Sequence, residues 1–154
     1  MDNIIIRPAT LADMDTLLRF EQGVITAERP FDPTLKDEHI NYYDLVGLIE
    51  RDDVELLVAE LDGKLIGSGY ARIEESKIYL KHPKHAYLGF MYVEPEHRGK
   101  GFNQKIIPTL KAWASTQNVT EYRLQVYYDN LPAIKAYEKI GFSKLMIKMR
   151  SDVI

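Results

Sequence analysis

The chain has 154 residues, of which 45% are hydrophobic and 28% are charged, a composition typical of one ordinary globular domain. It contains no cysteine, which excludes disulfides, thiolate metal sites and a cysteine-based acyl-enzyme. The formal net charge of −3 lacks the basic excess of a nucleic-acid-binding surface, and no segment reaches the apolar length of a membrane helix. We therefore expect a single domain over residues 1–154, with neither nucleic acid nor a membrane as partner. The four histidines show no metal-ligand spacing, so no metal is expected, and the absence of a signal peptide favours the cytoplasm.

The first part of the chain predicts a short strand and two helices. Residues 4–7 form the strand. Thr10 opens a capping box before a helix over residues 11–28, in which apolar residues recur at helical spacing. A second helix is predicted over residues 35–50, with Thr34 as its cap.

The middle of the chain predicts an antiparallel meander. Residues 54–61 form a strand, and Asp62-Gly63 is a two-residue hairpin turn of the type that requires positive φ at both positions. The partner strand covers residues 64–73, and an apolar run over residues 87–93 is the next strand.

The last part predicts, in chain order, a helix over residues 102–117, a strand over residues 122–127, a helix over residues 131–140 and a strand over residues 142–150. Pro108 should bend the first of these helices, Asn130 caps the second and Gly141 ends it. A meander followed by strand–helix–strand implies an α/β fold: a mixed, mostly antiparallel sheet of six or seven strands with about four helices on its two faces.

The most informative feature is the loop that follows the strand at residues 87–93. It contains Arg98, Gly99, Lys100 and Gly101, and it opens directly into a helix. The first backbone N–H groups of a helix lack partners and lie at the positive end of its dipole, so an anion fits there. The glycines allow a ligand to approach the backbone, and a pyrophosphate is the natural occupant. A plain surface turn is the competing interpretation.

Two other phosphate-binding loops are excluded. A P-loop needs Ser or Thr after its Lys, whereas Gly101 follows Lys100. A dinucleotide fingerprint needs a third glycine at the position that Gln104 occupies.

Two motifs resemble the GNAT superfamily of acyl-CoA-dependent N-acyltransferases, and the resemblance covers nearly the whole chain. Arg98-x-x-Gly101-x-Asn103 is similar to the family's Arg/Gln-x-x-Gly-x-Gly/Ala signature, with Asn103 in place of the usual small residue. The stretch from Asn130 to Phe142 is similar to the family's Asn-x-x-Ala-x-x-x-Tyr-x-x-x-Gly-Phe pattern without a gap.

The resemblance implies acetyl transfer from acetyl-CoA to a primary amine of a small molecule or a peptide. It implies that the main chain from Arg98 to Asn103 binds the pyrophosphate and that Met91 and Val93 contact the pantetheine arm. The implied cofactor set is Met91, Val93, Arg98, Gly99, Lys100, Gly101, Asn103, Asn130 and Tyr137. Members of the family are often dimers, which makes a homodimer one expected assembly.

The implied chemistry is direct attack in a ternary complex, because the chain has no cysteine to carry the acyl group. A backbone N–H near Met91 is the expected oxyanion donor, and Tyr137 is the candidate general acid for the departing sulfur. Tyr137 has a competing role in packing. Phe31, Tyr42 and Tyr43 are candidates for the acceptor pocket, with core packing as the alternative.

The general base stays open among Glu28, Tyr87, Tyr92, Glu94, His85 and a water chain. Two other functions also stay open. A non-catalytic acyl-CoA sensor would need only the loop, whereas retention of Tyr137 beside it favours an enzyme. A nucleotide-binding regulatory domain would be stabilised by ATP or NAD but not by coenzyme A.

Overall fold

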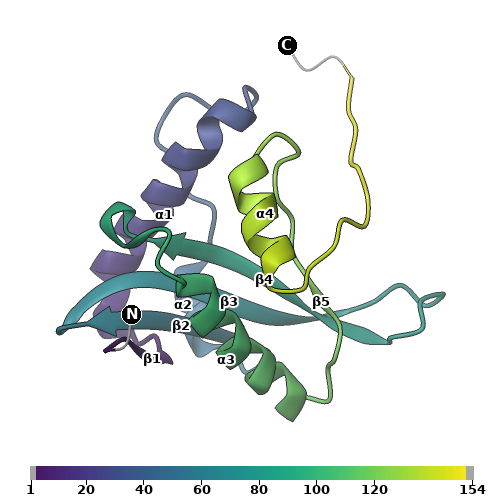
Figure 1. Ribbon diagram of the computed structural model, residues 1–154, viewed down its shortest axis with the longest axis horizontal. Helices are drawn as coiled ribbons and strands as arrows, with labels where there is room; N and C mark the ends of the chain where they lie inside the picture. Colours follow the sequence, from purple (N-terminus) through teal and green to yellow (C-terminus); the bar gives the residue numbers. More distant parts are fainter. Residues whose placement is uncertain (1–2, 152–154) are drawn as a thin grey trace.

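The computed structural model describes residues 3–151, and its frame is one sheet of five strands in the order β1-β2-β3-β4-β5 (Figure 1). The strands are β1 Ile5–Pro8, β2 Val54–Leu61, β3 Lys64–Glu75, β4 Lys84–Val93 and β5 Tyr122–Arg123. The helices are α1 Met14–Glu28, α2 Leu45–Glu50, α3 Phe102–Thr116 and α4 Leu131–Lys139. Short 3₁₀ turns cover Leu11–Asp13, Arg29–Phe31 and Pro95–His97.

The first four strands pair antiparallel, and only β4 and β5 run parallel. The predicted hairpin turn between β2 and β3 is confirmed, since Asp62 has φ of 52° and Gly63 has φ of 77°. A parallel pair needs a crossover connection, and α3 provides it between β4 and β5.

Each face of the sheet carries its own apolar core. On one face, Leu17 and Phe20 of α1 and Leu45 of α2 pack with buried residues of the sheet such as Val58. On the other face, the core is built around α3, whose Ile106 is fully buried. The mixed α/β architecture with helices on both faces is confirmed, with five strands instead of six or seven.

The helix predicted over residues 35–50 is wrong for most of its length. The helix starts at Leu45, and the side chain of Asp44, rather than Thr34, accepts from Gly47 N at 3.1 Å. The segment before it is held in a non-helical course from the 3₁₀ turn after α1, because Arg29 donates to the carbonyl oxygens of Lys36 and Glu38. These tertiary hydrogen bonds outweigh the weak helix propensity of the segment.

The predictions at the last two strands also differ from the structure. Residues 122–127 were expected to form one strand, but β5 ends at Arg123, where its pairing with Tyr87 ends. Residues 142–150 were expected to form the final strand, but they have no strand partner among the described residues. In Figure 1 they form the extended yellow trace that leads away from α4.

Candidate active site

A β-bulge interrupts β4 in the middle of the predicted cofactor strand. Ser68 pairs with Tyr92 and Tyr70 pairs with Gly89, so β4 holds one more residue than β3 between these two pairs. Phe90 takes the required positive φ of 53°. The hydroxyl of Ser68 donates to the carbonyl oxygen of Phe90 at 2.9 Å, which fixes the bulge. The bulge turns the backbone next to Met91 out of the regular pattern of hydrogen bonds between β3 and β4.

A cavity of about 220 Å³ lies where β4 and β5 part. It is bounded by the end of β4, by the end of α1, by the stretch after β5 and by α4. Its lining residues are Val24, Ala27, Glu28, Met91, Tyr92, Val93, Arg98, Val126, Tyr127, Asn130, Ala133 and Tyr137. Such a position, at the carboxyl end of diverging parallel strands, is a common place for ligands in α/β proteins.

The loop after β4 leaves the start of α3 open. Gly101 is the N-cap with φ of 84°, and no side chain caps the first turn of the helix. Gly99 has φ of 75°, and a Cβ atom added there would meet no other atom within 4 Å. An uncapped helix start with open space beside Gly99 is an arrangement that can accept an anionic group such as a diphosphate.

The structure places the predicted cofactor residues in two groups. Met91, Val93, Arg98, Asn130 and Tyr137 line the cavity. The others, Gly99, Lys100, Gly101 and Asn103, form the loop and the first turn of α3 that directly follow Arg98.

Two of these side chains are fixed by their own neighbours. Arg98 Nε donates to the carbonyl oxygen of Val93 at 3.1 Å, which ties the loop to the end of β4. Asn130 caps α4 by accepting from Ala133 N at 3.4 Å, so its side-chain amide nitrogen is not used by the cap.

Tyr137 lines the cavity from α4, and its ring packs edge-on against Phe142 with centroids 5.9 Å apart. Burial raises the pKa of the Tyr137 hydroxyl to about 12, so it is protonated at neutral pH. The residue therefore has both a packing contact and a proton available at the cavity.

Glu28 is the carboxylate that lines this cavity, at the last position of α1. Burial raises its pKa, and the neighbouring Tyr42 hydroxyl partly offsets that rise. The Tyr42 hydroxyl is itself buried and has no partner at hydrogen-bonding geometry among the described residues. The two groups thus face each other without a mutual hydrogen bond.

The other candidate bases have different surroundings. Glu94 is paired with Arg19 at 2.6 Å. The Tyr92 ring lines the cavity but packs on the Phe20 ring, with ring centroids 4.8 Å apart. Tyr87 is not among the lining residues, and burial raises the pKa of its hydroxyl.

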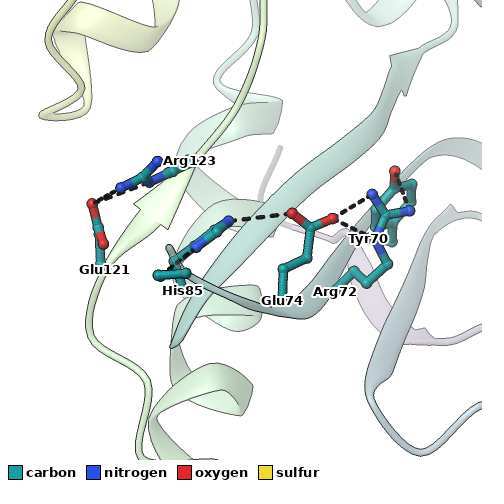
Figure 2. Close-up of polar contacts among 7 residues, drawn as sticks. Tyr70, Arg72, Glu74, His85, Glu121 and Arg123 are labelled. Atoms are coloured by element: carbon teal, nitrogen blue, oxygen red, sulfur yellow. Dashed lines mark hydrogen bonds and ion pairs between the residues drawn. The ribbon is translucent and has the colours of Figure 1, made fainter. Parts of the chain in front are cut away.

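His85 belongs to a separate polar chain along β3 and β4, drawn in Figure 2. Its Nδ1 lies 2.8 Å from Ser76 Oγ and its Nε2 lies 3.2 Å from Glu74 Oε1. Glu74 also accepts two hydrogen bonds from Arg72, at 2.8 and 2.6 Å. Because both ring nitrogens of His85 are engaged outside the cavity, this residue is no base for the site.

The predicted acceptor residues fall into two groups. Phe31 stacks on Tyr127 with ring centroids 5.9 Å apart, and Tyr127 lines the main cavity. Tyr42 and Tyr43 line a second cavity of about 120 Å³, together with Asp44, Gly47, Leu48, Arg51 and Arg72. The sequence reasoning did not single out Tyr127, although its place at the end of a predicted strand was a usable signal.

Glu21 is a buried group that the sequence reasoning also missed. It is fully buried in α1, and its Oε2 accepts from the backbone N–H groups of Tyr42 and Tyr43, both at 2.8 Å. Gln22 adds a hydrogen bond to the carbonyl oxygen of Ile40 at 2.8 Å. These contacts fix the irregular segment beside the cavity and explain why it is not helical.

Residues 3–151 contain neither a membrane-spanning helix nor a cluster of metal-ligating side chains. In that part of the chain, no helix has the length and apolar character needed to cross a bilayer. The same residues contain no group of three or more His, Cys, Asp or Glu side chains placed to hold a metal ion.

Comparison with known proteins matches this architecture. The model of the acetyltransferase (GNAT) family matches residues 17–142. An N-alpha-acetyltransferase of Sulfolobus acidocaldarius is 29% identical over 151 residues, covering 94% of this chain and 83% of that protein. A thialysine N-epsilon-acetyltransferase of Sus scrofa is 28% identical over 148 residues, covering 92% of this chain and 85% of that protein.

Among solved structures, a predicted acetyltransferase of Clostridium acetobutylicum crystallised with acetyl-CoA superposes with a TM-score of 0.73 at 17% identity, covering 96% of each chain. A Bacillus halodurans protein superposes with a TM-score of 0.83 at 18% identity, covering 95% of this chain and 97% of the other. At this level of identity the two structures show a shared fold. The family model covers most of the chain, so the chain belongs to the acetyltransferase (GNAT) family and is an acetyl-CoA-dependent N-acetyltransferase.

Proposed function

We propose that the protein transfers the acetyl group of acetyl-CoA to a primary amine by direct attack in a ternary complex. One observation carries the proposal: the bulged end of β4, the Glu28 carboxylate and the Tyr137 hydroxyl line the same cavity. They come from three separate elements, β4, α1 and α4, and together they supply the groups that the reaction needs.

The loop between β4 and α3 fits the diphosphate of coenzyme A. The uncapped start of α3 offers N–H donors, and Gly99 leaves open space beside the backbone. Arg98, within this loop, lines the cavity. From there the cavity wall continues along Val93 and Met91, where an extended pantetheine arm would find backbone groups that β5 does not use.

Bound acetyl-CoA supplies a thioester carbonyl. We assign the stabilisation of the negative charge that develops on that carbonyl oxygen to backbone N–H groups at the bulge of Phe90 and Met91, where the regular strand register is interrupted. Preorganised donors of this kind typically contribute ~10²–10³ to the rate.

Tyr137 then serves as the proton donor to the sulfur when the C–S bond breaks. Its pKa of about 12 lies ~3.5 units above that of an ordinary thiol at ~8.5, equivalent to ~5 kcal/mol for complete proton transfer. A hydrogen bond from the hydroxyl to the developing thiolate offsets much of that cost, and the hydroxyl remains available as donor throughout the neutral range.

Glu28 is the base that we assign to the acceptor. A primary ammonium has a pKa near ~10.4 and must lose a proton before its nitrogen attacks. A buried carboxylate with a raised pKa attracts that cation and takes up its proton. The overall reaction converts the ammonium and the thioester into an amide and a free thiol and releases one proton to solvent.

The relatives favour an amine on a peptide or an amino acid as the acceptor. The names of the two relatives specify an α-amine and the ε-amine of thialysine. The tyrosines near Glu28 suit either amine, because aromatic faces attract an ammonium ion.

The test is release of free thiol from acetyl-CoA with a panel of acceptors. The panel holds peptides with a free N-terminus, peptides with a blocked N-terminus and a free internal lysine, peptides in which both kinds of amine are blocked, and small polyamines. We expect turnover with at least one free primary amine and none with fully blocked peptides. Tight binding of acetyl-CoA without turnover of any amine would instead identify a non-catalytic sensor.

A further inference from the structure

The second cavity, of about 120 Å³, has two arginines in its wall. Arg51 comes from the end of α2 and Arg72 from β3. Their acidic partners, Asp53 and Glu74, are not among the residues that line the cavity. The space has room for a small charged group on a short stem, but not for a cofactor. Its wall therefore presents positive charge, although the chain as a whole has a net charge of −3.

Both arginines retain hydrogen-bond donors for a ligand. Arg51 donates through Nε and Nη2 to Asp53, at 2.9 and 2.7 Å, and among residues 3–151 no other group accepts from its guanidinium. Arg72 donates through the same two atoms to Glu74, at 2.8 and 2.6 Å. Figure 2 shows Arg72 between Glu74 and Tyr70, whose hydroxyl lies 3.5 Å from Nη1, at the outer limit for a hydrogen bond. A guanidinium has five N–H donors, so each arginine keeps its Nη1 edge for a further acceptor.

Arg72 is held in place before any ligand arrives. Its guanidinium carbon lies 5.5 Å from the ring centroid of Tyr70 and 5.3 Å from that of Tyr87. Its partner Glu74 is itself fixed, because Nε2 of the buried His85 lies 3.2 Å from Glu74 Oε1. An arginine that is stacked on two rings and held by a fixed carboxylate loses little conformational freedom when it binds an anion.

Asp44 is the acidic side chain in the wall of the second cavity. Its Oδ1 accepts from Gly47 N at 3.1 Å and caps the start of α2, so this carboxylate already has a structural role. The wall thus combines two cations that have donors to spare with one carboxylate that caps a helix. A carboxylate is the ligand that fits best, because its two oxygens can accept from two guanidinium edges.

Two tyrosines connect the second cavity with the Glu28 site. Tyr42 lines the second cavity, and burial followed by the nearby Glu28 carboxylate raises the pKa of its hydroxyl. Tyr87 carries Arg72 on its ring, and Glu28 adds to the rise in its pKa that burial mainly causes. Glu28 and Arg72 are therefore separated by little more than one layer of tyrosine side chains.

We propose that Arg51 and Arg72 bind a carboxylate carried by the acceptor, so that the preferred acceptors are acidic. The amine lies at Glu28 and the carboxylate lies in the second cavity. This inference rests on the proposed function, because Glu28 marks the position of the amine. The carboxylate comes either from an acidic side chain near the N-terminus of a peptide or from the α-carboxylate of an amino acid whose side-chain amine reacts. Both sources present the same group to the two arginines.

Matched pairs of acceptors give the first test and distinguish the two sources. One pair is a C-terminally amidated peptide with glutamate at its first or second position and the same peptide with glutamine there. The other pair is Nα-acetyl-lysine and its amide. In at least one pair we expect kcat/KM to be on the order of tenfold higher for the acid, as for a charge-assisted hydrogen bond. The advantage should shrink as salt is added. Equal kcat/KM within both pairs overturns the proposal.

Substitution of the arginines gives the second test. Arg51→Gln and Arg72→Gln should each reduce the preference for the acid severalfold, while kcat/KM for the neutral acceptor stays nearly constant. Arg51 is 53% exposed, so its replacement leaves the packing intact, and Arg51→Glu should favour a peptide with lysine in place of the glutamate. A preference that survives both glutamine variants overturns the proposal.

Arg123→Gln is the matched control. Arg123 donates through Nε and Nη2 to Glu121, at 3.1 and 3.0 Å, and its side chain is 30% exposed, against 31% for Arg72. It has the same kind of ion pair but does not line the second cavity. Its replacement should therefore leave the preference for the acid unchanged. An equal loss of preference in this control would assign the effect to overall charge and overturn the proposal.

Binding measured without turnover keeps this proposal separate from the proposed function. With coenzyme A at saturation, the Nα-acetylated glutamate peptide should raise the Tm of the wild type more than its glutamine counterpart does. Arg72→Gln should abolish that difference. If no amine were acetylated, the proposed function would fail, yet the difference in Tm would still identify a carboxylate site. Equal Tm values with the two peptides overturn the carboxylate site whether or not amines are acetylated.

Discussion

One side of the cavity is formed mainly by backbone and the other mainly by side chains. The cofactor side consists mainly of backbone within two short stretches, residues 90–103 and 130–137, with a bulge, two positive-φ glycines and the uncapped start of α3. The acceptor side consists of side chains from distant parts of the chain, held by buried contacts such as Glu21 with Tyr42. A backbone-made site tolerates sequence change away from its glycines, whereas a side-chain-made site can change its ligand with single substitutions. Substitutions on each side should therefore affect different kinetic constants.

The largest effect is expected at Tyr137, where the two sides meet. Tyr137→Phe keeps the ring against Phe142 and removes only the proton donor. We expect kcat to fall by about 10³ while the KM for acetyl-CoA changes little, as for loss of a general acid. Steady-state kinetics with both substrates varied provide the measurement. A variant with unchanged kcat would limit Tyr137 to packing α4 on the sheet.

The second effect is expected at Glu28. Glu28→Gln keeps the shape of the side chain but removes the base, so kcat/KM for the amine should fall by about 10². A protonated carboxylic acid accepts no proton, so wild-type activity should decline as the pH falls through the Glu28 pKa. Burial raises that pKa above its ordinary value of 4.5. The variant should lose this acidic limb of the pH profile. A profile with the same acidic limb would move the base to a water chain.

Tyr137 and Glu28 also show which parts of the candidate site could be predicted from the sequence and which could not. Tyr137 and the loop around Gly101 lie in contiguous motifs, so the sequence alone could propose a role for each of them. Glu28 remained one of several candidate bases, since its raised pKa results from burial by segments distant in sequence.

The errors in the predicted fold have the same origin. Residues 35–44 carry no local signal for the hydrogen bonds that hold them out of a helix, in which Glu21 accepts from Tyr42 N and Arg29 donates to the carbonyl oxygen of Lys36. Residues 142–150 do alternate as in a strand, but a strand forms only where another strand is available to pair with it. Neither β5, which stops at Arg123, nor any other described strand supplies that partner.

A third prediction concerns Glu21, whose substitution should disturb only the acceptor side. Glu21→Ala leaves the N–H groups of Tyr42 and Tyr43 without their buried acceptor, which should lower the free energy of unfolding by roughly 1–3 kcal/mol. The KM for the amine should rise, while the KM for acetyl-CoA stays the same. Glu21→Gln is the matched control because its amide oxygen still accepts both hydrogen bonds, and it should restore most of the loss. Equal increases in both KM values would show that the two sides are not separable.

The smallest effect is expected on the cofactor side, and the chain offers a matched pair to isolate it. Gly99 and Gly63 have nearly the same φ, 75° and 77°, and a Cβ atom on either would meet no atom within 4 Å. Alanine at either position should therefore cost about 1 kcal/mol of stability through backbone strain alone. Only Gly99→Ala alters the backbone that we assign to the diphosphate, so only this variant should raise the KM for acetyl-CoA, by a few-fold. Thermal unfolding compares the strain, and initial rates compare the binding. If Gly63→Ala, on the β2–β3 turn, raised that KM as much, the loss would reflect general destabilisation, and the diphosphate site would have to lie elsewhere.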